Sequence, residues 1–94
     1  MKKTFKLKLG IEYYNKGIIQ IPVRFMDDIP KSGGIPISLI IENNPPITRT
    51  FILAEQNRKI NGRDELKDWY QKNFKLNDEV NVEIISETEF RIYK

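Results

Sequence analysis

Cysteine and histidine are both absent from this chain of 94 residues. Without cysteine there is no disulfide, no thiolate metal site and no cysteine nucleophile. Without histidine the chain lacks the usual zinc ligand and the commonest general base. Most hydrolytic mechanisms need one of these parts, so we expect a non-catalytic domain that holds no metal and no cofactor.

Long hydrophobic runs are missing as well. No stretch approaches the ~20 apolar residues of a membrane-spanning helix. Residues 1–10 alternate lysine with apolar residues, unlike a signal peptide. We therefore expect a cytoplasmic protein with no membrane partner. The adjacent acidic pairs Asp27-Asp28, Asp64-Glu65 and Asp78-Glu79 do not reproduce the spaced carboxylates and strand-borne lysine of a metal-dependent nuclease.

What is present suits one small globular domain that spans residues 1–94. Hydrophobic residues make up 39% of the chain, and five Phe, four Tyr and one Trp can build a packed core. Residues 1–63 carry 11 Lys or Arg against 5 Asp or Glu, whereas residues 64–94 carry 5 against 8. This asymmetry indicates a surface that faces a polyanion, or simply an uneven surface charge.

Alternating apolar residues predict short strands throughout the chain. The predicted strands cover residues 4–9, 18–21, 35–41, 47–54, 58–60, 80–85 and 90–93. A short helix is predicted at 23–29 and a longer one at 64–74, where Leu66, Trp69, Tyr70 and Phe74 form one stripe that we assign to the core. This profile predicts a mixed β fold with two short helices, arranged as a seven-stranded open β-barrel. A strand–helix–strand pattern occurs twice, near residues 18–41 and 58–85, and suggests two related halves.

Two segments resemble the DNA-binding pseudobarrel superfamily. Residues 16–25, Lys-Gly-Ile-Ile-Gln-Ile-Pro-Val-Arg-Phe, are similar to its strand-into-helix segment. Residues 62–83 are similar to its second half, where a helix leads into a leucine, turn, aspartate and valine step, here Leu76, Asn77, Asp78 and Val80. Plant B-three domains share this order, as do DNA recognition domains of bacterial restriction endonucleases, including type IIE effector domains. The position of Trp69 inside the helix favours the bacterial branch.

The resemblance implies a barrel that grips the major groove of DNA with two arms. One arm is the loop between the first two strands, which corresponds to residues 13–16 here. The other joins the fourth and fifth strands and corresponds to residues 55–63. In the sequence, both segments are polar stretches that interrupt the alternating apolar residues of the predicted strands.

These arms carry side chains that can read DNA. Arginine suits guanine, asparagine and glutamine suit adenine, and lysine and tyrosine can hold phosphate. The candidate DNA-binding residues are Tyr13, Tyr14, Asn15, Lys16, Arg24, Arg49, Gln56, Asn57, Arg58, Lys59, Asn61 and Arg63. We expect Arg58 to be exposed. The alternatives are a hairpin turn with one tyrosine in the core for the first arm and a solvated polar loop for the second.

We therefore expect sequence-specific binding of double-stranded DNA through the major groove. The bacterial branch implies the recognition or effector domain of a restriction endonuclease in restriction-modification, with a fused or associated nuclease domain as a partner. A stand-alone transcription regulator with the same barrel is the main alternative. A barrel that binds protein or carbohydrate is the alternative of a different class, which a weak salt dependence of binding would favour.

Overall fold

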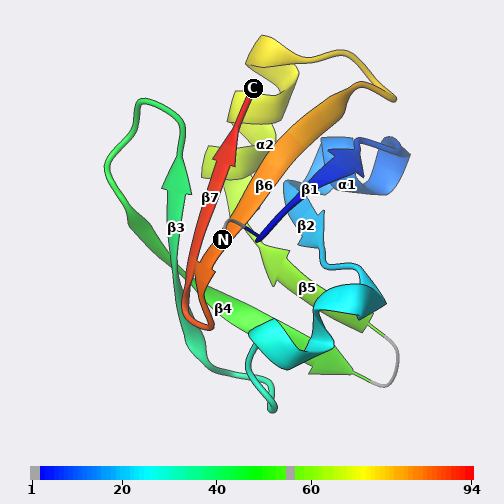
Figure 1. Ribbon diagram of the computed structural model, residues 1–94. Coiled ribbons are helices and arrows are strands. Elements are labelled where there is room, and N and C mark those ends of the chain that lie inside the picture. Colours follow the sequence, from blue (N-terminus) through cyan, green and yellow to red (C-terminus); the bar gives the residue numbers. More distant parts are fainter. Residues whose placement is uncertain (1–2, 55–56) are drawn as a thin grey trace.

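Seven strands form one barrel-shaped sheet that is nearly closed (Figure 1). The computed structural model describes residues 3–54 and 57–94. The strands are β1 (Lys3–Lys8), β2 (Ile18–Gln20), β3 (Pro36–Ile41), β4 (Ile47–Ala54), β5 (Asn57–Asn61), β6 (Glu79–Ser86) and β7 (Glu89–Tyr93). Their order is β1-β6-β7-β3-β4-β5-β2, and every neighbouring pair is antiparallel except β3 and β7. The predicted barrel is confirmed, and each predicted strand lies within one residue of the observed bounds.

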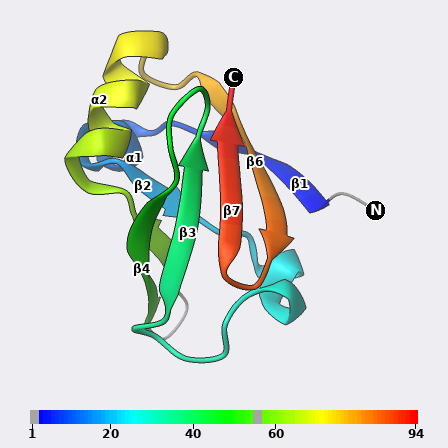
Figure 2. The same ribbon diagram turned by 90° about the vertical axis from the view of Figure 1, so that its left-hand side faces the viewer.

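Three short helices accompany the sheet, one more than the sequence predicted. The helix α1 (Ile11–Lys16) connects β1 to β2, the 3₁₀ helix η1 (Val23–Asp28) follows β2, and α2 (Arg63–Asn73) follows β5. The two α-helices lie together at one end of the barrel, and η1 lies at the other end (Figure 2). None of the helices in the described residues is long and apolar enough to cross a membrane.

The missed helix α1 replaces the predicted polar loop. It contains only six residues, and both of its half-buried side chains are tyrosines, so it shows no apolar stripe. It ends at Gly17, which has a φ of 67° and donates its N–H to the carbonyl of Tyr13. Glycine adopts this left-handed conformation without strain, which stops the helix directly before β2.

The core fills the inside of the barrel. Alternating strand residues point inward, such as Phe5 and Leu7 in β1, and are at most 7% exposed. From α2, Leu66 and Tyr70 enter the same core with no exposed surface, as predicted. Trp69 and Phe74 are only half-buried and pack against the edge of the core. The buried stripe of α2 is therefore narrower than the sequence predicted. The two expected strand–helix–strand units occur as β2–η1–β3 and β5–α2–β6.

Candidate nucleic-acid interface

The strand β5 places three polar side chains in a row on the outside of the barrel. Ile60 points inward and is fully buried. Because side chains alternate along a strand, Asn57, Lys59 and Asn61 lie on the opposite, outer face. Asn57 and Asn61 are exposed, and Lys59 is partly exposed. The row therefore presents two amides on either side of one cation.

Neighbouring strands extend this row without adding a carboxylate. Gln20 in β2 is paired with Lys59, so the two side chains share one face of the sheet. On the other side Ile52 of β4 is opposite Lys59, and Ala54 is opposite Asn57. We call the outer side chains of Gln20, Asn57, Lys59 and Asn61 the β5 face.

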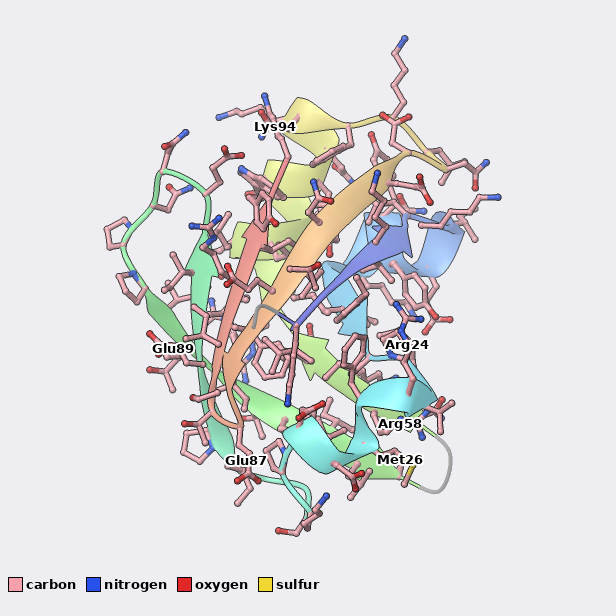
Figure 3. All side chains as sticks on the ribbon, viewed as in Figure 1. Arg24, Met26, Arg58, Glu87, Glu89 and Lys94 are labelled. Atoms are coloured by element: carbon pink, nitrogen blue, oxygen red, sulfur yellow. The ribbon has the colours of Figure 1, made fainter. Side chains whose placement is uncertain are left out.

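Acidic residues are confined to one arc of the barrel wall. The sequences of β1 to β5 contain no Asp or Glu, whereas β6 and β7 contain Glu79, Glu83 and Glu89. Figure 3 shows Glu87 and Glu89 on the β6–β7 hairpin, to the left of Arg58 in this view. Among the residues that the structure describes, no three acidic side chains gather closely enough to hold a metal ion. The β5 face thus lies in an arc of the sheet whose only strand-borne charges are positive.

The first predicted arm is a packed helix, which corrects the expectation of a loop. Tyr13 and Tyr14 both pack against the core. The hydroxyl of Tyr14 donates a hydrogen bond to the carbonyl of Phe74 at 2.9 Å. The hydroxyl proton of Tyr14 is therefore engaged within the protein. Asn15 and Lys16 remain exposed at the end of α1.

The end of α1 adjoins the start of α2, at one end of the β5 face. The backbone N–H of Gly62 donates to the carbonyl of Gly17 at 2.7 Å. Arg63 has a φ of 56°, which is uncommon for a residue other than glycine. Its N–H donates to the side-chain oxygen of Asn61 at 3.0 Å. This junction brings the exposed side chains of Lys16 and Arg63 to the Asn61 end of β5.

Arg24 and Arg58 lie at the opposite end of the β5 face. The N–H of Ile21 donates to the carbonyl of Arg58 at 2.8 Å, so η1, which begins two residues later, adjoins the start of β5. Figure 3 shows Arg24, Met26 and Arg58 at this end of the barrel. The guanidinium of Arg24 lies over the ring of Phe25, 4.8 Å from its centroid.

Arg58 is not exposed, which corrects the prediction from the sequence. It shares the inward parity of Ile60 and is half-buried. Its Nε atom is buried and has no hydrogen-bond partner in the described part of the chain. The exposure predicted for Arg58 is therefore wrong, because its side chain points to the inner face of β5. Gln56, another candidate, lies outside the described residues.

Arg49 does not join the other candidates. It points toward α2, where its guanidinium forms an ion pair with Glu65 and donates from Nε to the carbonyl of Gly62 at 3.2 Å. The hydrogen bond from Arg49 lowers the pKa of Glu65. Only 13% of the Arg49 side chain is exposed. Its position indicates a link between β4 and α2.

The second predicted arm therefore contains β5 itself and supplies three of the four residues of the β5 face. The first predicted arm, as the end of α1, adjoins the Asn61 end of that face. Sequence analysis missed Gln20, because its place beside Lys59 depends on a pairing between strands that are distant in the chain. The alternation within 18–20 does mark it as the polar member of its strand.

These features define a nearly closed seven-stranded barrel, which is consistent with a pseudobarrel fold. No protein-family model matches the chain, and comparison with curated proteins gives no significant match. Among solved structures, the chain is similar to that of the hypothetical Arabidopsis thaliana protein At1g16640.1. The TM-score is 0.67 at 13% sequence identity, over 98% of this chain and 88% of that chain. At this identity the likeness concerns the fold alone.

Proposed function

We propose that this protein binds double-stranded DNA with the β5 face and the cations at its two ends. The observation that carries the proposal is the arrangement of Gln20, Asn57, Lys59 and Asn61 in a continuous outer row, within a wall of strands that contains no carboxylate. Amides can pair with adenine edges, and lysine can hold phosphate. A carboxylate in that row would repel phosphate.

The dimensions of the row support binding to a groove. From Asn57 to Asn61 the strand extends ~14 Å, at about 3.4 Å per residue. The major groove of B-DNA is about 12 Å wide. Lys16 and Arg63 at one end and Arg24 at the other are thus spaced to reach the phosphates on both sides of a groove. The amides between them would face the base edges.

Within this proposal the protein is a non-catalytic recognition domain with a sequence preference. The resemblance to restriction-associated domains supports a role in restriction-modification, with a nuclease domain fused to it or associated with it. A transcription regulator would use the same face in the same way. Identification of the proteins encoded beside it, or fused to it, would separate these two roles.

The proposal is tested by selecting bound sequences from a random duplex library and then titrating the enriched site at several salt concentrations. We expect log affinity to fall linearly with log salt, by about 0.9 for each phosphate neutralised. We also expect weaker binding to either single strand, because the β5 face offers no aromatic ring on which bases could stack. If no sequence is enriched and no salt-sensitive duplex binding is measured, the proposal is wrong.

A further inference from the structure

A cavity of about 430 Å³ lies outside the barrel, between α2 and the connection from β3 to β4. Figure 2 shows this connection beside α2, at the end of the barrel opposite η1. Ligand pockets in proteins typically measure about 300–1,000 Å³ and combine apolar walls with a few polar groups. The cavity has this size and this character, and it contains none of the residues of the β5 face.

The walls of the cavity are apolar and rest on the core. Ile41, Pro45, Ile47 and Trp69 supply them. Ile41 is 3% exposed, and Ile47 packs against the core from the start of β4. The ring of Trp69 makes an edge contact with Phe74, with 5.3 Å between the ring centroids. Core contacts therefore support three of the four apolar wall residues, Ile41, Ile47 and Trp69, whereas Pro45 lies in the exposed connection.

The rim carries one free charge of each sign. Asp68 and Lys72 line the cavity from successive turns of α2, and both are exposed. Neither forms a salt bridge or a side-chain hydrogen bond with any residue that the structure describes. Glu65 also lines the cavity, but its charge is compensated by Arg49. The carboxylate and the ammonium group are four residues apart, with Cβ atoms about 5–6 Å apart, a spacing at which they can pair with each other or bind one ligand together. In this structure they form no salt bridge with each other.

We propose that this cavity binds a free α-amino acid with an apolar side chain. The α-ammonium group of the ligand would pair with Asp68 and its α-carboxylate with Lys72. The apolar side chain would cover the indole of Trp69 and the side chains of Ile41 and Ile47. A ligand with a single charge could pair with only one of the two rim groups and would leave the other without a partner. A zwitterion can pair with both groups, and its apolar side chain can cover the apolar walls.

Trp69 makes the proposal directly testable, because it is the one tryptophan of the chain. The intact protein is titrated with L-leucine, L-isoleucine, L-methionine and L-phenylalanine while the fluorescence of Trp69 is recorded. We expect a saturable change with at least one of them. We expect at least tenfold weaker binding for the N-acetylated amide of the same amino acid, which keeps the side chain and removes both charges.

Two variants test the rim, and two matched variants serve as controls. Asp68→Asn and Lys72→Gln should each weaken binding at least tenfold. Asp64→Asn and Lys75→Gln remove the same charges from exposed positions that do not line the cavity, and they should bind like the unaltered protein. Circular dichroism confirms that each variant is folded.

Three results would overturn the proposal: no saturable fluorescence change with any of the four amino acids, equal binding of the blocked derivative, or unchanged binding in both rim variants. The assay contains no DNA, so its outcome does not depend on the function proposed for the β5 face.

Discussion

Arg49 and Lys59 carry the same charge on neighbouring strands, yet they have different surroundings. Arg49 is bound to Glu65 and to the carbonyl of Gly62, whereas Lys59 forms no salt bridge within the described residues. Register decides this difference: Arg49 points toward α2, and Lys59 points outward from the barrel beside Gln20. A residue's type therefore indicates which contacts it can make, and its position on the sheet decides which it does make.

Lys59→Gln should weaken binding to different duplexes by similar factors, because a lysine that holds phosphate carries no sequence information. The slope of log affinity against log salt should become about 0.9 less steep, as expected for one lost phosphate contact. Fluorescence anisotropy at four salt concentrations measures both quantities. Lys94→Gln, at the end of the chain beyond β7, is the matched control. An equal loss in the control would remove Lys59 from the interface.

The pair formed by Arg49 and Glu65 predicts a pH dependence of stability. Arg49 lowers the pKa of Glu65 in the folded protein. Because the pKa of Glu65 is lower in the folded protein than in the unfolded chain, its ionised form stabilises the fold at pH values above the unfolded pKa. This stabilisation is lost as the pH falls through the folded pKa of Glu65. Urea unfolding should therefore show Glu65→Gln to be less stable than the unaltered protein at pH 7. The difference should shrink steadily below pH 4. A difference that stays constant from pH 7 to pH 2.5 would contradict this assignment.

Among the secondary-structure elements, the junction of α1 and α2 depends on close backbone contact. A Cβ atom on Gly17 would lie 2.5 Å from the carbonyl oxygen of Arg63 and 2.6 Å from the amide nitrogen of Lys67. Such distances are too short for any side chain. The glycine is therefore needed twice, for the end of α1 and for the approach of α2.

Gly17→Ala should destabilise the fold by about 2–4 kcal/mol, since it combines a strained left-handed backbone with overpacking. Gly34→Ala provides the matched control, because Gly34 also has a positive φ, of 82°, but has no atom within 4 Å of the position of a Cβ. This control should cost only about 1 kcal/mol. Chemical unfolding of both variants measures the two values. If both variants lose the same free energy of unfolding, the contact between α1 and α2 contributes nothing to the cost of Gly17→Ala.

For the whole molecule, the important feature is the separation of charge around the barrel. The strands β6 and β7 carry all the strand-borne carboxylates, together with the cation Arg91. The strands β1, β4 and β5 carry only cations, and β2 and β3 carry no charged residue. Under the function proposed above, the strand-borne carboxylates of β6 and β7 would repel duplex DNA, whereas the cations of β4 and β5 would attract it. The chain's net charge of +3 understates this effect because the two sides partly cancel.

The purified protein should bind duplex DNA in the presence of Mg²⁺ without cutting it. The chain has no His or Cys, and the described residues contain no group of three acidic side chains that could hold a metal ion. A gel shift together with analysis of the DNA products measures binding and cleavage in one reaction. Cleavage that persists through purification and disappears in Asp78→Asn or Glu79→Gln would contradict the non-catalytic assignment.

The sequence by itself determined the strands, the helix α2 and most of the core. Alternation of apolar residues is a local property, and each strand buries the face that this pattern marks. The same pattern correctly placed Leu66 and Tyr70 of α2 in the core. Composition alone also established the absence of disulfides and of histidine chemistry.

Only the tertiary structure decided which polar residues share a surface. The helix α1 was missed because its half-buried side chains are tyrosines, whose packing depends on α2 and on the core. Gln20 meets Lys59, and Arg49 meets Glu65, through contacts between segments that are far apart in the chain. The cavity beside Trp69 likewise exists only where the connection from β3 to β4 approaches α2. Periodicity reports which face of a strand or helix is buried, but it carries no information about which other element covers that face.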